Sequence, residues 1–294
     1  MKNNAIFLTF DDGYQLLGMA CIRSIQQRYP EHPVILVLFN GEDENVLAEL
    51  QQMPRVKLLD PVKYAFNAEG FSSGPVGSPA VYNRYILWSD LFDEYDDILY
   101  VDSDVLVLAP LDELFSLNGF FSVANNCSYY TVRIFDPEYE NHPGLHKLLR
   151  EYQLDYPYEP NDMINSGVMV IPKQYRNAEN FNQLVQITRD FSPYLGFEDQ
   201  SAISIWMKLH DIEPYFCYEY NYQTAFLNKN SNTNILNEIA ILHFSTHKPF
   251  TAAFRRWEFV QGRVRELEKL FASFVVLPQA SQAAAVEAEP VLSA

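Results

Sequence analysis

Residues 98–108 read ILYVDSDVLVL, and this stretch decides the fold class. Four hydrophobic residues lead into the acidic motif Asp102-Ser103-Asp104, and four more follow it. A continuous hydrophobic run bounded by polar residues is typical of a strand buried on both faces of a sheet. Two unpaired carboxylates between such runs are costly to fold unless something binds them. The stretch therefore predicts a buried strand, 98–101, that ends at an acidic binding motif.

The segments before this motif alternate between strand and helix signals. Because helices separate the strands, we expect a parallel sheet with right-handed crossovers. The loop Asn67–Pro79, rich in Gly, Ser and Pro, is long enough to form a lid or a binding segment. Hydrophobic periodicity predicts strands at 5–10, 34–39 and 56–59, and helices at 14–28, 42–53 and 80–92.

The segments after the motif continue this pattern, interrupted by the aromatic-rich segment Asn125–Asp162. We expect one α/β domain over residues 1–250, a C-terminal helix over 251–276 and a disordered tail over 277–294. Strands are predicted at 168–171 and 239–242, and helices at 111–115, 178–190, 199–209 and 254–274.

The overall composition excludes several classes of protein. The net charge is −17, and so acidic a chain repels phosphate backbones, which excludes nucleic acid as a partner. No window reaches the roughly 18 consecutive apolar residues that an integral membrane segment needs, and the N-terminus does not resemble a signal peptide, so we expect a cytoplasmic protein. Cys21, Cys127 and Cys217 lie far apart and indicate neither a disulfide framework nor a zinc site.

Polar residues follow three of the predicted strands: Asp11-Asp12, Asp102-Ser103-Asp104 and His243. Ligands bind at the carboxyl ends of strands in open parallel sheets, so we expect these groups to meet at one edge. Residues i and i+2 of an extended segment point to the same side, so Asp102 and Asp104 can bind one divalent cation. His243 can complete the site, and such a mixed oxygen and nitrogen set suits Mn²⁺ better than Mg²⁺. A bound cation would let this acidic chain bind an anionic phosphate ligand.

Other residues are weaker candidates. Lys248 could pair with a phosphate, and His247 competes with His243 although it does not directly follow the strand. Asp199-Gln200 stands at a predicted helix start, where Asp199 could equally be an N-cap. Asn165-Ser166-Gly167 precedes a predicted strand, and a plain turn is its alternative.

Taken together, these motifs resemble the retaining glycosyltransferases of family 8, over about 7–250. The resemblance predicts the GT-A nucleotide-diphospho-sugar transferase fold, an α/β domain with a mixed, mostly parallel central sheet flanked by helices. The landmarks occur in family order: Thr9-Phe10-Asp11-Asp12-Gly13-Tyr14, Tyr82-Asn83-Arg84-Tyr85, Ile98 to Asp104, Asn165-Ser166-Gly167-Val168, Glu198-Asp199-Gln200, and His243 to Pro249.

The resemblance also implies roles for individual residues. Asp102, Asp104 and His243 match the Mn²⁺ ligands of the family, and Lys248 matches a lysine that contacts the diphosphate. Donor binding would involve Thr9, Asp11 and Tyr14 at the uracil and ribose, Arg84 and Ser103 near the sugar and diphosphate, and Asn165, Ser166, Asp199 and Gln200 around the donor sugar, the last two nearest the reacting carbon.

The predicted activity is retaining transfer of a hexose, from UDP-glucose or UDP-galactose, to a saccharide, glycolipid or protein hydroxyl. A metal-dependent sugar nucleotidyltransferase and a non-catalytic nucleotide-sugar-binding module are the alternatives. Because aromatic faces pack on sugar rings, Asn125–Asp162 is a candidate acceptor surface, and an aromatic core is its alternative. The basic residues of 254–274 could give weak peripheral contact with an anionic membrane, although a solvated helix explains them as well.

Overall fold

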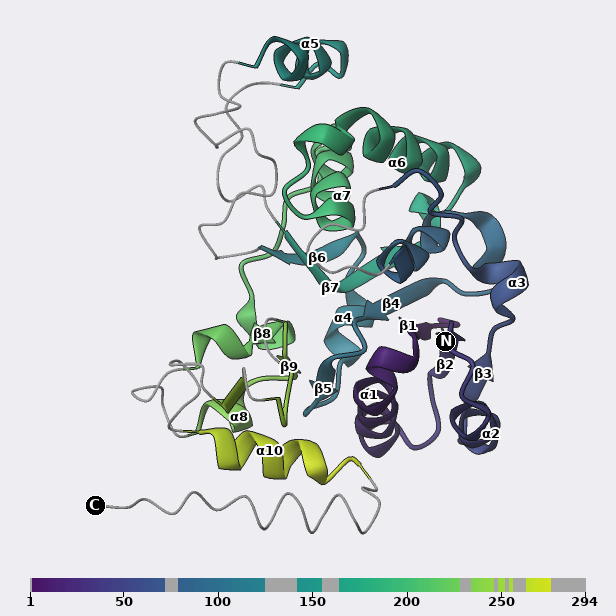
Figure 1. Ribbon diagram of the computed structural model, residues 1–294, viewed down its shortest axis with the longest axis vertical. Helices are drawn as coiled ribbons and strands as arrows, with labels where there is room; N and C mark the ends of the chain where they lie inside the picture. The colour runs from purple at the N-terminus through teal and green to yellow at the C-terminus, as the bar shows by residue number, and fades with distance from the viewer. Residues whose placement is uncertain are drawn as a thin grey trace.

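The computed structural model describes residues 2–71, 79–124, 142–154, 164–227, 234–245, 248–251, 254–255 and 263–275. Its centre is a six-stranded sheet, in which the first four strands are parallel and the last two run antiparallel to their neighbours. In spatial order the strands are β3 (Val56–Leu58), β2 (Val34–Phe39), β1 (Ala5–Phe10), β4 (Asp97–Val101), β7 (Ile164–Pro172) and β6 (Phe121–Ala124). The mixed, mostly parallel α/β sheet is thus confirmed (Figure 1).

Both faces of the sheet are buried, which explains the continuous hydrophobic runs. Along β1, Ile6 and Leu8 pack into a core with α1 (Gln15–Arg28) and α2 (Glu44–Gln52). Ala5 and Phe7 point to the opposite face, into a core with α6 (Ala178–Phe191) and α7 (Glu198–Leu209). Successive side chains of a strand alternate between faces, so a strand covered on both sides must be hydrophobic throughout.

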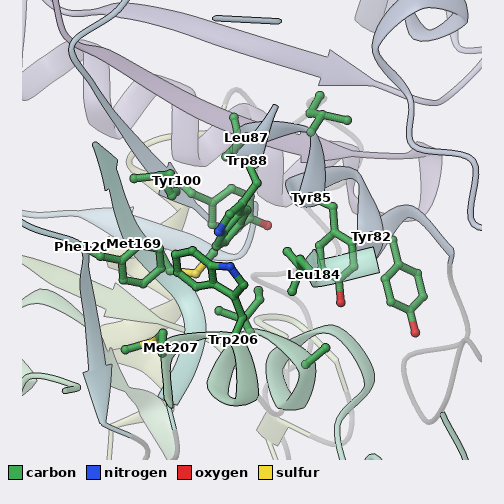
Figure 2. Packing of buried hydrophobic residues seen from close by; sticks show 14 of the residues in the cluster. Tyr82, Tyr85, Leu87, Trp88, Tyr100, Phe120, Met169, Leu184, Trp206 and Met207 are labelled. Atoms are coloured by element: carbon green, nitrogen blue, oxygen red, sulfur yellow. The ribbon is translucent and has the colours of Figure 1, made fainter. Parts of the chain in front are cut away.

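The second core contains several large aromatic side chains (Figure 2). Trp88 and Trp206 meet edge to face, with ring centroids 5.5 Å apart. Each large buried side chain of this kind contributes about 1.5–3 kcal/mol relative to an exposed one. This core fixes α7 against the sheet, and α7 carries two of the predicted site residues at its start.

A smaller three-stranded sheet lies beside the first. It contains β5 (Val105–Val107), β9 (Ile241–His243) and β8 (Tyr222–Gln223) in that order. The chain passes from the large sheet to the small one between β4 and β5, at the Asp102-Ser103-Asp104 motif. α10 (Val264–Ala272) packs against this sheet through a third hydrophobic cluster (Figure 1). The second hydrophobic run of the opening stretch therefore belongs to a second sheet.

Short elements complete the described chain. The α-helices are α3 (Pro61–Tyr64), α4 (Asp112–Ser116), α5 (Pro143–Glu151) and α8 (Ile235–Glu238). The short 3₁₀ turns are η1 (Asp12–Tyr14), η7 (Lys173–Tyr175), η8 (Ser192–Tyr194), η9 (Tyr218–Tyr220) and η10 (Thr224–Phe226).

Two local predictions were wrong. The segment predicted as one helix over 80–92 forms two 3₁₀ helices, η3 (Pro79–Trp88) and η4 (Asp90–Phe92). A 3₁₀ helix has three residues per turn, so Tyr82, Tyr85 and Trp88 share one line along it and all enter the aromatic core. Asn165-Ser166-Gly167 was expected before a strand, but these residues lie within β7, which pairs with β4 and β6.

Several predictions fall on parts of the chain outside the described residues. These are most of the aromatic-rich segment, at 125–141 and 155–163, the loop residues 72–78 and the tail from 276 onward. Of the predicted helix 254–274, the described portion contains α10. The division at residues 250 and 276 stays a prediction. None of the helices described has the length and hydropathy needed to cross a membrane.

Candidate functional site

The Asp102-Ser103-Asp104 turn is fixed by both sheets. The Asp102 N–H donates to the carbonyl of Gly167 on β7 at 2.8 Å, and the Phe244 N–H donates to the carbonyl of Asp104 at 2.9 Å. Val105 pairs directly with His243 across the small sheet. The pairing of β5 with β9 therefore brings His243 beside the two carboxylates.

The side chains of Asp102, Asp104 and His243 converge. One ligand atom from each lies within 4.8 Å of the other two. The Nε2 atom of His243 is 3.2 Å from Oδ1 of Asp104 and 3.7 Å from Oδ2 of Asp102. His243 and Asp104 are buried, whereas the Asp102 side chain is 23% exposed, so the group opens toward solvent on the Asp102 side.

Gly167 forms the floor of this site beneath His243 and Asp102. A Cβ at this position would lie 2.3 Å from Cε1 of His243 and 2.9 Å from Oδ2 of Asp102. Glycine inside a strand often marks such a close approach. The two carboxylates and the imidazole are an oxygen and nitrogen donor set suited to a divalent cation of the Mn²⁺ type, so these residues fit the metal that the motif implies.

The other carboxylate oxygens are bound to protein groups. Oδ1 of Asp102 accepts from Nη2 of Arg84 at 3.0 Å and from the Tyr100 hydroxyl at 2.5 Å. Oδ2 of Asp104 accepts from the Lys248 ammonium. Burial acts to raise the pKa of Asp104, but Lys248 and His243 together outweigh it, by charge and by hydrogen bonding, and hold this pKa well below its usual range. Asp104 is thus ionised, and each of the two aspartates keeps one oxygen facing His243.

Arg84 connects three elements of the site from a buried position. Its Nε lies 3.1 Å from Oδ2 of Asp199, and its Nη1 donates to the hydroxyl and the carbonyl of Ser166 at 2.7 and 3.1 Å. Its guanidinium carbon lies 4.6 Å from the centre of the Tyr100 ring. Burial acts to lower the pKa of Arg84, but Asp102 and Asp199 raise it above its usual value. Every guanidinium nitrogen has a protein partner, so Arg84 organises the carboxylates around it.

The start of α7 supplies two more polar groups. Oε1 of Gln200 accepts from the Ser166 N–H at 3.2 Å, and the Ser166 hydroxyl donates to Asp199 at 3.4 Å. Glu198, the first residue of α7, has φ of +31°, a strained value for a residue with a side chain. Burial raises the pKa of Asp199 despite the opposing Arg84 charge. The structure therefore brings β7 and the first turn of α7 into one buried polar network.

The predicted nucleotide segment lies at the end of β1. The hydroxyl of Thr9 accepts from the side chains of Asn40 and Asn83 at 3.2 and 3.3 Å. Asp11 caps η1 by accepting from the Gly13 N–H at 3.0 Å. The Tyr14 ring is half-buried, and its centre lies 5.6 Å from the Lys248 ammonium, which ties this segment to the acidic site.

Three residues near the site have roles that the sequence motifs did not predict: Tyr100, Gly167 and Asn221. Tyr100 stands two positions before Asp102 in an extended segment and so points to the same side, a signal that could have found it. Gly167 was quoted as part of a motif without its steric role. Asn221, whose Oδ1 lies 2.8 Å from Nδ1 of His243, carries no signal in its own sequence neighbourhood.

Comparison with known proteins assigns the chain to a family. Residues 5–252 match the model of Glycosyl transferase family 8. The chain belongs to this family. The family 8 resemblance of the motifs is confirmed, and family membership makes the protein a glycosyltransferase, which sets aside the nucleotidyltransferase and the non-catalytic module.

Relatives and solved structures agree with the family 8 assignment. Galactinol synthase 5 of Arabidopsis thaliana is 24% identical over 247 residues, covering 81% of this chain and 70% of the relative. The galactosyltransferase LgtC, solved with donor and acceptor sugar analogues, superposes with a TM-score of 0.64 at 17% identity, covering 95% of this chain and 99% of LgtC. GlyE of Streptococcus pneumoniae TIGR4 gives 0.59 at 18% identity, over 96% of this chain and 62% of GlyE. These likenesses show the GT-A fold.

Proposed function

We propose that this glycosyltransferase moves a hexose from a UDP-sugar, UDP-glucose or UDP-galactose, to a hydroxyl of a saccharide, glycolipid or protein, with retention of configuration. The observation that carries the proposal is the convergence of Asp102, Asp104 and His243 within 4.8 Å. Both carboxylates direct one oxygen to the histidine and one to a fixed protein cation. The galactosyltransferase activity named for LgtC and the synthase named for the plant relative favour a hexose donor.

In this proposal Asp102, Asp104 and His243 bind Mn²⁺, with Mg²⁺ as the alternative. When bound, the metal would act as a Lewis acid that neutralises charge on the departing UDP. Lys248 lies close to both Asp104 and Tyr14, so its ammonium can reach the diphosphate of a nucleotide whose base stacks on Tyr14. Thr9 and Asp11 would line the ribose and uracil, and Ser103 the diphosphate.

The polar network of β7 and α7 would surround the donor sugar. Asn165, Ser166, Asp199 and Gln200 would line it, and Arg84 would keep the carboxylates of Asp102 and Asp199 in place. An amide such as Gln200 is a poor nucleophile, and the Asp199 carboxylate is already paired with Arg84 and Ser166. These contacts favour attack by the acceptor hydroxyl on the face that UDP leaves, with the acceptor proton passing to a diphosphate oxygen.

A UDP-release assay over a panel of UDP-hexoses tests the proposal. We expect release with Mn²⁺, less with Mg²⁺ and none with EDTA, and an unchanged anomeric configuration in the product by proton NMR. Absence of UDP release from every UDP-sugar, in the presence of saccharide, glycolipid and protein acceptors, would count against the proposed donor class. A sugar covalently trapped on Asp199 would replace same-face attack by double displacement. Intact mass after incubation with UDP-glucose tests whether the chain glycosylates its own tyrosines.

A further inference from the structure

His243 has a second hydrogen-bonding partner, on the side away from the carboxylates. Its Nδ1 lies 2.8 Å from Oδ1 of Asn221, and the two residues are 2% and 1% exposed. A neutral imidazole carries a proton on one nitrogen and a lone pair on the other. Because the oxygen of Asn221 can only accept, the proton of the neutral ring belongs on Nδ1, which leaves Nε2, the nitrogen beside Asp102 and Asp104, to bind a metal.

The orientation of the Asn221 amide is fixed by Asn165. Nδ2 of Asn221 donates to Oδ1 of Asn165 at 2.8 Å and to its carbonyl at 3.4 Å. Oδ1 of Asn165 also accepts from the backbone N–H of Gly167 at 3.1 Å, and that group can only donate. Rotating the Asn221 amide by half a turn would place its oxygen against the oxygen of Asn165. The network thus has one consistent arrangement of donors and acceptors, set by a backbone N–H.

The sheet holds Asn221 at this distance. Asn221 directly precedes β8, in which Tyr222 and Gln223 pair with Leu242 and His243 of β9. Its own N–H donates to the carbonyl of Tyr218 at 3.2 Å. Both partners of the Asn221–His243 hydrogen bond therefore stand on neighbouring, hydrogen-bonded segments, so the ring cannot turn without breaking a buried contact.

We infer that Asn221, anchored by Asn165, is a positioning residue that keeps the His243 proton on Nδ1 and directs Nε2 toward the metal position. The inference rests on the proposed metal-binding function of His243. It also gives Asn165 a second role beside the sugar contact predicted for it. Mutating the hydrogen-bonding partner of a metal-ligating histidine typically lowers metal affinity about 10–100-fold.

The test measures Mn²⁺ binding to the full chain without donor, from the electron paramagnetic resonance signal of free Mn²⁺. The Asn221→Leu variant has no oxygen to accept a hydrogen bond from Nδ1 of His243, and we expect its Kd for Mn²⁺ to rise about 10–100-fold. Asn221→Asp restores the acceptor oxygen for Nδ1, but its second oxygen meets the oxygens of Asn165, so we expect a Kd between those of Asn221→Leu and the wild type. Asn180→Leu is the matched control: Asn180 is also buried and donates to the Tyr175 carbonyl at 3.0 Å, but it lies on α6. It should lower the melting temperature and leave the Kd unchanged.

The outcomes separate the role of Asn221 from the proposed metal site. Equal Mn²⁺ affinity in wild type and Asn221→Leu, with both folded in a thermal melt, overturns the inference. An Asn221→Asp variant that binds as weakly as Asn221→Leu overturns it as well. If Asn221→Leu does not fold, Asn221→Ala takes its place with the same expectation. Failure of the wild type to bind Mn²⁺ or Mg²⁺ refutes the proposed metal site itself, and the role of Asn221 falls with it.

Discussion

Gly167→Ala adds one methyl group to the floor of the candidate metal site, and its effect can be worked out from the structure. The new Cβ would lie 2.3 Å from Cε1 of His243, whereas ordinary contacts begin at 3.4 Å. The imidazole must therefore retreat by about 1 Å, or the β7 backbone must move by as much. The ring is enclosed by Asn221 and by the pairing of β9, and the Gly167 backbone accepts from the Asp102 N–H and donates to Oδ1 of Asn165, so neither movement is free.

The expected result is a folded protein that has lost its metal. Overpacking of a buried site costs about 1–3 kcal/mol, which lowers the melting temperature by a few degrees. Metal–ligand distances are tolerated only within about 0.2 Å, so a shift of about 1 Å removes His243 from the ligand set. We expect Mn²⁺ affinity to fall at least about 100-fold, and UDP release to fall with it. Electron paramagnetic resonance and calorimetry measure the two effects separately.

Gly119→Ala is the matched control, because a Cβ there meets nothing within 4 Å. We expect this variant to keep both its melting temperature and its Mn²⁺ affinity. If folded Gly167→Ala binds Mn²⁺ as tightly as the wild type, the reasoning is refuted. In that case His243 would not be a metal ligand, or the backbone at Gly167 would move more easily than its hydrogen bonds to Asp102 and Asn165 imply.

Three further predictions concern the charges of the site. Burial raises the pKa of Asp199, so its ionised form destabilises the fold, and Asp199→Asn should melt at a higher temperature than the wild type at pH 7.5. This difference in melting temperature should shrink as the pH falls, because Asp199 of the wild type then takes up a proton. Calorimetry over a range of pH values checks this prediction. The same substitution should lower turnover about 100-fold while Mn²⁺ binding survives, as UDP-release and resonance assays would show. Lys248→Met removes a cation beside Asp104 and should tighten Mn²⁺ alone but weaken UDP about tenfold, a divergence that calorimetric titration can measure.

The sequence predicted the elements whose pattern is local. Strands β1 and β2 have the predicted bounds, because both faces are buried and the hydrophobic runs are uninterrupted. The 3₁₀ form of η3 was missed because its segment fits either helix type, and only the aromatic core selects a spacing of three. β7 was predicted too short because polar residues begin it, and these face the site.

The site shows the same division between local and long-range information. The motif around Asp102 and the strand near His243 can be recognised in the sequence, but the expectation that they meet at the edge of one parallel sheet was wrong. His243 lies in the small sheet, and the antiparallel pairing of β9 with β5 brings it beside the motif. The roles of Asn221 and Gly167 depend on contacts across 22 and 76 positions, to His243, which no local pattern encodes. The sequence therefore predicted the charged residues and the neutral residues Asn165, Ser166 and Gln200, but not Asn221 or the steric role of Gly167.

The charge balance of the site bears on how the proposed anionic donor would bind to this acidic chain. Asp102, Asp104 and Asp199 bring three negative charges into a small buried region, and Arg84 and Lys248 return two positive ones. The apo site is therefore negative by one charge, which repels a diphosphate but attracts a cation. With a divalent cation in place the same groups carry a net positive charge, and only then does the site favour UDP. We therefore expect ordered binding, metal before donor, and the net charge of −17 on the whole chain makes that order stricter, because it repels a donor without metal within a Debye length of about 8–10 Å.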